Sequence, residues 1–403
     1  MAASAIGVVC GLIGTMFHFG VHEVTAFRGT HPWVLYLLPL AGFVIVSFYK
    51  LTETDGLGTD DIIDAVHEGK RLPILLLPAI FFGTVLTHLC GGSAGREGAA
   101  LQMGGTIGQC MGRTFRLDDR DLRVATLAGM AAFFSALFGT PLAATVFAIM
   151  VISIGVLYHV ALYPSLLAAL VAYGVSVRLG VEPTRFTVAV PDQSVGMFVR
   201  VAALGVLCAL VSILFCKLMH GAGHLMKRIK NPWLQVICGG FAVIALTWVF
   251  GTDYNGAGMD IVTRAIEQET VAVPWAFLLK LVFTAVTLAA GFKGGEVVPS
   301  FFVGATFGCA VSPLLGLPVG FGAAIGLAAV FCGVTNCPVA STLLAVELFG
   351  AEGMLYFALA CCLSYMLSGY QGLYSSQTIL YSKLKAQFIN VHTNAYHAGE
   401  KTE

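Results

Sequence analysis

The chain has 403 residues, of which 57% are apolar and only 11% are charged, whereas soluble globular proteins are about 45–50% apolar and about 25% charged. Lysine plus arginine and aspartate plus glutamate both total 22, so the chain carries no net charge and no basic field that would attract nucleic acid. This composition excludes a disordered chain and a small disulfide-rich scaffold, and it predicts a polytopic α-helical membrane protein.

Apolar runs separated by glycine, proline or charged residues follow one another along the chain. They cover residues 2–24, 33–50, 73–90, 97–112, 124–136, 141–158, 160–179, 196–220, 233–250, 274–292, 298–316, 320–334, 338–349 and 354–368. The first run lacks the basic start of a signal peptide, so we expect a membrane helix there. Several runs are shorter than the roughly 17–25 residues that span a bilayer, which predicts half-helices that end at membrane depth.

The glycine content points to a pore or a transporter. The chain contains 47 glycines, and glycine lets membrane helices approach closely and break inside protein. The 11 cysteines include no CxxC pair and are expected to be small buried apolar residues. His18 and His22, like His220 and His224, share a helix face, but neither pair has a third ligand nearby. We therefore expect interfacial histidines, and neither a metal nor a cofactor.

Two parts of the chain resemble each other at an offset close to 200 residues. Residues 140–148 resemble 337–345, and residues 95–97 resemble 294–296. Duplication in a membrane protein indicates repeats, often inverted, with the substrate site between them. We expect an N-terminal repeat over residues 1–190, a C-terminal repeat over 191–388 and a short polar tail over 389–403.

The segment 91–102 is the first candidate site. Glycines deliver Arg96, Glu97 and Gly98 to the start of an apolar helix, where free N–H groups and the helix dipole attract an anion. A carboxylate at this position is a tethered anion, and its protonation would release the site. The alternative is a glutamate that only caps an interfacial loop.

The segment 293–299 repeats the pattern. Glycines precede Glu296 at the start of a helix expected over 300–312, with Pro299 near the first turn. Between Val297 and Val298 a dry carboxyl favours its neutral form, which suits proton transfer. The alternative is a surface cap paired with Lys293.

Two further glycine-hinged polar breaks stand outside these segments. The first contains Gly56, Leu57 and Gly58, and its alternative is a solvated acidic loop. The second contains Tyr374, which we expect to precede an apolar helix. The tyrosine hydroxyl is a neutral donor for an anion, and its alternative is an aromatic anchor at the membrane interface.

Together these segments resemble the CLC family of chloride channels and proton-coupled anion transporters. The family signatures GSGIP, GREGP and GxFxP, followed by a late tyrosine, correspond to GLGTD at 56–60, GREGA at 95–99, GEVVP at 295–299 and Tyr374. The resemblance extends from residue 2 to about residue 385. It implies an all-α polytopic membrane protein with a CLC-type inverted repeat and broken half-helices, assembled as a homodimer with one pathway per subunit.

Departures from these signatures concern the substrate. Leu57 replaces the serine of the chloride type, residues 145–152 contain no proton-relay glutamate, and Glu296 enters the third signature. These changes resemble the fluoride/proton antiporter branch, although that branch typically has Met or Asn at Leu57 and often Thr at Val298. A chloride/proton exchanger and a passive anion channel of the same fold stay open. A membrane enzyme is not expected, because no HExxH, GxSxG or phosphate-loop motif accompanies the two glutamates.

The resemblance implies roles for individual residues. Glu97 is the gating glutamate and Glu296 the central proton relay. The residues expected to bind the anion are Gly56, Leu57, Gly58, Arg96, Gly98, Val297, Val298 and Tyr374. We expect the protein to export fluoride, or chloride in the alternative, in exchange for protons that flow inward. It would be a multi-pass protein of the bacterial plasma membrane, in contact with lipid, and it would not bind nucleic acid.

Overall fold

The computed structural model describes residues 1–270, 273–385 and 387–394. The first half of the chain contains α1 (Ala2–Thr30), η1 (Pro32–Leu37), α2 (Leu38–Leu51), α3 (Thr59–Glu68), α4 (Leu76–Leu89), α5 (Glu97–Thr114), α6 (Asp119–Phe138), α7 (Pro141–Met150), β1 (Ser153–Ile154), η2 (His159–Ala161) and α8 (Leu162–Arg178). The second half contains α9 (Val195–Met226), α10 (Pro232–Phe250), α11 (Met259–Glu267), α12 (Ala276–Ala289), α13 (Val297–Leu315), α14 (Val319–Thr335), α15 (Pro338–Phe349), α16 (Met354–Leu367), β2 (Thr378–Tyr381) and β3 (Phe388–His392). The predicted helical membrane fold is confirmed.

The helices fall into two length classes. Among the described residues, seven helical segments are long and apolar enough to cross a membrane, and six apolar helices have only 10–17 residues. The short class includes α4 and α12, both of 14 residues, and α7 and α15. These short helices are the predicted half-helices, whose ends are tolerated at membrane depth because surrounding protein buries them.

Matching backbone geometry recurs about 200 residues apart. After α4 and α12 the chain turns at Gly91 (φ +82°) and Gly291 (φ +103°), in the left-handed region that glycine adopts without strain. Thr140 (φ −123°, ψ 71°) and Cys337 (φ −119°, ψ 70°) precede the prolines that begin α7 and α15. The local backbone geometry therefore matches at these two pairs of positions. Residues 181–194, between α8 and α9, form neither helix nor strand, and we propose that the repeats join there.

Helix pairs within each half approach at glycine. A Cβ atom added to Gly108 of α5 would lie 2.1 Å from the Ala125 carbonyl oxygen of α6, and one added to Gly308 of α13 would lie 2.1 Å from the Gly322 carbonyl oxygen of α14. Neither distance is compatible with a side chain, so glycine is required for both contacts. Every described residue of α14 from Gly320 to Thr335 is buried, which places this helix in the interior of the second half.

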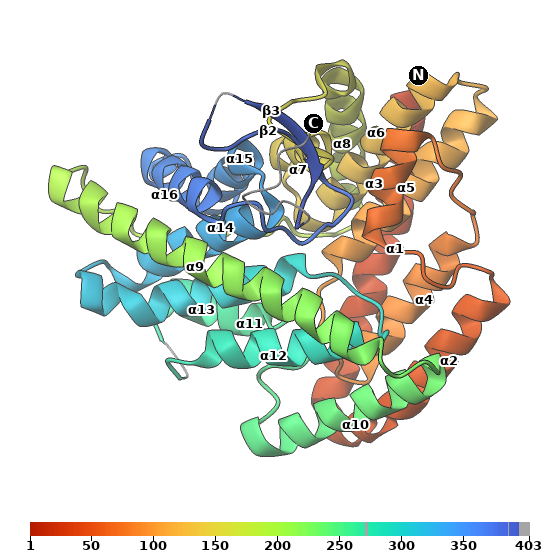
Figure 1. Cartoon of the computed structure of the whole chain (residues 1–403), viewed down its shortest axis with the longest axis horizontal. Coiled ribbons are helices and arrows are strands. Elements are labelled where there is room, and N and C mark those ends of the chain that lie inside the picture. The colour runs from red at the N-terminus through yellow and green to blue at the C-terminus, as the bar shows by residue number, and fades with distance from the viewer. Residues whose placement is uncertain (271–272, 386, 395–403) are drawn as a thin grey trace.

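The two halves lie side by side. In Figure 1 the helices of the first half, red to yellow, lie mostly on the right, and those of the second half, green to blue, lie mostly on the left. The long helix α9 crosses the face that is toward the viewer, and α10 packs against α2 at the lower edge. The boundary between the halves passes through the region where α5 and α13 begin.

A small sheet and two amphipathic helices depart from the prediction. The apolar helix expected after Tyr374 is wrong, because Thr378–Tyr381 forms strand β2, which pairs parallel with β1 and antiparallel with β3. Side chains of a strand alternate between the two faces of the sheet, and in β2 this alternation leaves Ile379 fully buried. The segment expected as a polar tail from residue 389 begins inside β3, and residues 395–403 of it lie outside the described residues. The short amphipathic helices α3 and α11 lie outside the predicted apolar runs.

Candidate functional site

Two helices begin back to back in the middle of the molecule. Gly95 and Gly295 form an antiparallel bridge in which each N–H donates to the other carbonyl oxygen over 2.7 Å. Helix α5 begins at Glu97 and α13 at Val297, each two residues beyond the bridge. The first N–H groups of a helix have no partner within it, so the bridge brings two sets of such donors, one from each half of the chain, to one place. Helix N-termini are common anion-binding positions in proteins, because their N–H groups and dipoles favour negative charge.

Glu97 occupies the start of α5. Its side chain is 1% exposed. One carboxylate oxygen, Oε2, accepts from the Arg96 main-chain N–H at 2.9 Å, and Oε1 accepts from Arg96 Nε at 3.3 Å. Arg96 in turn donates from Nη1 to His18 Nδ1 over 3.1 Å. The Glu97 carboxyl group therefore lies at the N-terminus of α5, held by the main chain and the side chain of Arg96.

Arg96 and Glu97 line a cavity of about 490 Å³. The cavity is also lined by His18 and His22 of α1 and by residues 257–261 around the start of α11. His18 is half-buried, and its ring contacts the Arg96 guanidinium. No sequence pattern pointed to this contact, since α1 and the start of α5 are far apart in the chain.

Glu296 precedes α13 and faces the other helix start. Its Oε2 atom lies 3.6 Å from the position that a Cβ of Gly98 would take. That Cβ would also lie 2.7 Å from the Cα of Gly295. Glycine at position 98 therefore permits the close approach of the Gly295 backbone, while the Glu296 carboxyl lies within ordinary contact distance of the first turn of α5. No ion pair within 4.0 Å joins Glu296 to Lys293 or to any other described residue, so the alternative of a surface cap paired with Lys293 is wrong.

A second cavity of about 320 Å³ surrounds Glu296 and shares no lining residue with the first. Three predicted backbone positions, Gly56, Leu57 and Gly58, line it together with Tyr374. Tyr374 is 3% exposed, and its hydroxyl has no hydrogen-bond partner among the described residues. A buried donor without a partner is costly, so this hydroxyl is free to donate to an occupant of the cavity.

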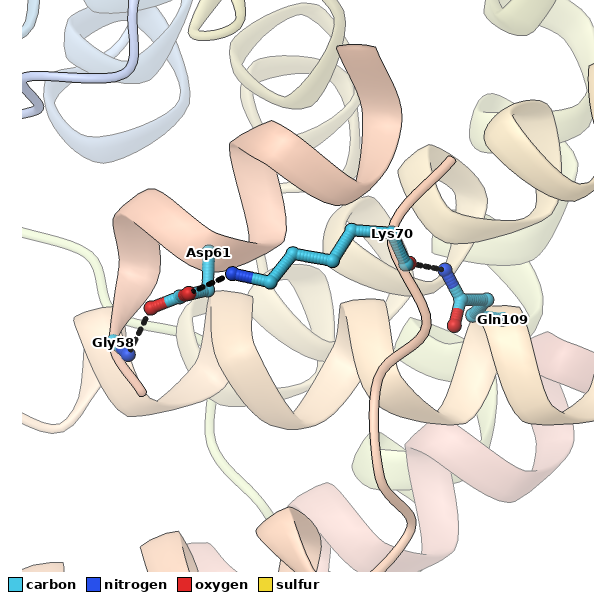
Figure 2. A network of polar contacts seen from close by, with 4 residues as sticks. All are labelled: Gly58, Asp61, Lys70 and Gln109. Carbon is cyan, nitrogen blue, oxygen red and sulfur yellow. Dashed lines mark hydrogen bonds and ion pairs between the residues drawn. The ribbon is translucent and has the colours of Figure 1, made fainter. Parts of the chain in front are cut away.

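Polar contacts fix the loop that carries Gly56–Gly58. The main-chain N–H of Gly58 donates to Asp61 Oδ2 at 2.9 Å, and Lys70 Nζ donates to Asp61 Oδ1 at 2.6 Å. The Lys70 carbonyl oxygen accepts from Gln109 Nε2 of α5 at 2.9 Å, as Figure 2 shows. The start of α3 is thereby tied to α5. Glu53, Asp55 and Gly56 are exposed, so the acidic loop is solvated in part while Gly58 and Asp61 are held by these contacts.

Four of the predicted anion-binding residues lie outside the second cavity. Arg96 lines the first cavity, while Val297 and Val298 are 0% and 1% exposed and line neither cavity. Only their main-chain N–H groups, in the first turn of α13, are available to an anion. Gly98 lines neither cavity, and its contribution is the close approach to Gly295 and Glu296.

Most residues of the second cavity were not predicted as site residues, among them Tyr49, Asp60, Gln102 and Lys293. Asp60 accepts from the Ser376 N–H at 3.1 Å, and burial raises the pKa of its carboxyl. Asp60 and Lys293 lie within the glycine-hinged polar segments, and a charged residue in such an apolar chain could have identified them as candidate site residues. Tyr49 and Gln102 lie inside apolar helices and carried none.

Comparison with known proteins agrees with this geometry. Residues 40–369 match the model of the voltage gated chloride channel family. The chain is 38% identical over 393 residues to a chloride/fluoride channel protein of Pseudomonas syringae pv. tomato, covering 94% of this chain and 86% of that protein. It is 25% identical to an H(+)/Cl(-) exchange transporter of Vibrio campbellii, covering 86% and 81%. The crystal structure of a CLC-type fluoride/proton antiporter superposes with a TM-score of 0.91 at 32% identity, covering 94% of this chain and 97% of that one. The chain therefore belongs to the CLC family of voltage gated chloride channels and anion transporters, as a multi-pass membrane protein.

Proposed function

We propose that this chain is a fluoride/proton antiporter that exports fluoride while protons flow inward. The observation that carries the proposal is the placement of Glu97 in the first cavity and Glu296 in the second, at two helix starts that meet at the Gly95–Gly295 bridge. A passive pore needs no second internal acid. Helix α7 contains no acidic side chain, so Glu296 is the acid available for a relay. The similarity to a CLC-type fluoride/proton antiporter supports the same conclusion.

Glu97 acts as the gate in this proposal. When ionised, its carboxylate holds the donors at the start of α5 and excludes a mobile anion from them. Protonation removes the charge and weakens both hydrogen bonds from Arg96, because bonds to an ionised acceptor are about twice as strong as neutral ones. The side chain then leaves the donors to the anion and carries its proton away.

Glu296 couples the proton to the anion. A neutral Glu296 donates a hydrogen bond to an arriving anion, whereas an ionised one repels it. Its protonation state is therefore tied to anion occupancy, which is the requirement for exchange. We assign the remaining anion contacts to Gly56, Gly58 and the Tyr374 hydroxyl in the second cavity.

Selectivity for fluoride follows from the loss of a hydroxyl. Leu57 lines the second cavity without offering a donor, so a large anion lacks a contact that serine would supply. Fluoride is costly to dehydrate and needs strong donors in return. Main-chain N–H groups and the protonated carboxyl of Glu296 supply them. Chloride/proton exchange is the second candidate, because a named H(+)/Cl(-) exchange transporter is also similar to this chain.

The assembly is proposed as a homodimer in the bacterial plasma membrane, with one pathway per subunit. Apolar side chains stand exposed on α7, α15 and α16, including Leu142 (48%), Val339 (49%) and Leu355 (50%). Lipid and a second subunit both suit such surfaces. Crosslinking in lipid bilayers checks this point, and a species that is monomeric at all protein densities argues against the dimer.

Proteoliposomes test the transport proposal. Purified protein is reconstituted with fluoride inside, and a fluoride electrode and a pH electrode record efflux and proton uptake together. We expect fluoride efflux with stoichiometric proton uptake, and little chloride efflux under the same conditions. Fluoride movement without proton uptake indicates the passive channel, and equal chloride exchange indicates the chloride/proton exchanger.

A further inference from the structure

Lys293 places an unpaired cation in the second cavity. Its Nζ atom lies 4.2 Å from the ring centroid of Tyr49. Among the described residues no carboxylate lies within 4.0 Å of Nζ, and none accepts a hydrogen bond from it. The face of an aromatic ring stabilises an ammonium only in part. Three donor hydrogens of Lys293 are therefore left for an occupant of the cavity.

Helix α4 positions this lysine. The Lys293 main-chain N–H donates to Thr87 Oγ1 at 3.2 Å. A Cβ atom added to Gly83 would lie 3.1 Å from Lys293 Cγ and 3.2 Å from Tyr49 Cε2. Glycine at position 83 thus provides the space in which the two side chains pack together. The contacts with α4 therefore hold the Lys293 and Tyr49 side chains together, so that neither extends freely into solvent.

Tyr49 adds a second unsatisfied donor. Its side chain is 1% exposed and lines the same cavity, and its hydroxyl has no partner among the described residues. Leaving a buried hydroxyl unsatisfied costs about 1–3 kcal/mol. With Tyr374, two such hydroxyls and one ammonium face a single cavity.

Acidic residues outnumber basic residues in the lining of the second cavity, and the Lys293 ammonium offsets part of their negative charge. Asp60, Asp61 and Glu296 line the cavity, and Lys293 is the one basic residue among its described lining residues. The charge of Asp61 is already engaged by Lys70 at 2.6 Å. Without Lys293 the cavity would repel any anion that approached Glu296.

We propose that Lys293 and Tyr49 form an anion-binding station, which holds a small monovalent anion in the second cavity before it reaches Glu296. Under the proposed function, on which this inference rests, that anion is fluoride. The ammonium supplies the attraction, and the Tyr49 hydroxyl supplies a directed donor. The competing explanation is that Lys293 only balances the acidic residues and binds nothing.

Fluoride titration calorimetry on the purified full-length protein tests the station. We expect Tyr49→Phe to raise the Kd for fluoride about fivefold, as the loss of one hydrogen bond implies. Lys293→Met should raise it at least about tenfold and Lys293→Arg much less, because the guanidinium keeps the charge. Lys50→Met is the matched control, since Lys50 also lies over an aromatic ring, 3.7 Å from the centroid of Trp233, but does not line the cavity.

Transport measurements separate this inference from the proposed function. In proteoliposomes the fluoride concentration for half-maximal efflux should rise in Lys293→Met and Tyr49→Phe and stay at the wild-type value in Lys50→Met. Unchanged fluoride affinity in Tyr49→Phe, which preserves packing, overturns the station even where Lys293→Met fails to fold. Wild-type protein that moves no fluoride with protons overturns the proposed function itself.

Discussion

Replacement of Gly295 by alanine tests whether the two helix starts must touch. A Cβ atom at this position would lie 2.2 Å from the main-chain nitrogen of Gly98 and 2.7 Å from its Cα. Ordinary contacts begin near 3.4 Å, and both partners are backbone that cannot rotate away. The starts of α5 and α13 would therefore have to separate by roughly 1 Å, which is the kind of overpacking that costs about 1–3 kcal/mol.

The separation also breaks the bridge. Both hydrogen bonds between Gly95 and Gly295 are 2.7 Å long, and each contributes about 0.5–1.5 kcal/mol. We expect Gly295→Ala to lose about 4 kcal/mol of stability in all, from strain and the two lost bonds. Because Glu97 and Glu296 are positioned by this bridge, a displacement of about 1 Å should lower coupled turnover about 100-fold.

The assay pairs thermal unfolding in detergent with proteoliposome efflux. Gly174→Ala in α8 serves as the control, since a Cβ there would meet nothing within 4 Å and alanine favours a helix over glycine by about 1 kcal/mol. The control should melt at or above the wild-type temperature and transport normally. A Gly295→Ala protein with wild-type melting and wild-type coupled flux would refute the requirement for contact between the helix starts.

Four further substitutions have definite expected outcomes. Glu97→Gln should lower proton flux about 100-fold or more, because an amide cannot exchange a proton, and uphill proton pumping by this variant would show that Glu97 is not the gate. Glu296→Gln should leave fluoride movement slow or uncoupled, whereas normal proton flux would show that the proton takes another path. Leu57→Ser should raise chloride flux relative to fluoride about fivefold, the effect of one added hydrogen bond, as measured with parallel fluoride and chloride electrodes. The hydrogen bond to Asp61 raises the pKa of Lys70 above 10.5, so the stabilisation from this pair is present below pH 10.5 and is lost as the pH rises through the raised pKa. Lys70→Met should therefore lower the melting temperature slightly at pH 8 and have no effect at strongly alkaline pH, and an equal deficit at both pH values would contradict the assignment.

Local patterns were enough to locate the elements and the two acids. Apolar runs bounded by glycine and proline predict the half-helices, because proline at the first turn and glycine before it set where a helix begins. The prolines at 141 and 338 start α7 and α15, as the sequence indicates. Glu97 was recognisable because a carboxylate is costly in an apolar chain and marks a helix start there. Glu296 followed from the same reasoning, although α13 begins at Val297, three residues before the predicted start.

Contacts between distant segments were decided only by the tertiary structure. The Gly95–Gly295 bridge, the contact of Arg96 with His18 and the packing of Lys293 on Tyr49 join residues far apart in the chain. The segment after Tyr374, where we expected a helix, forms strand β2, because it pairs with β1 on one side and β3 on the other. Sequence periodicity records which face of an element is apolar and where the element ends, because those features depend on neighbours along the chain. It does not record which other element covers that face, since that choice depends on how all the helices pack together.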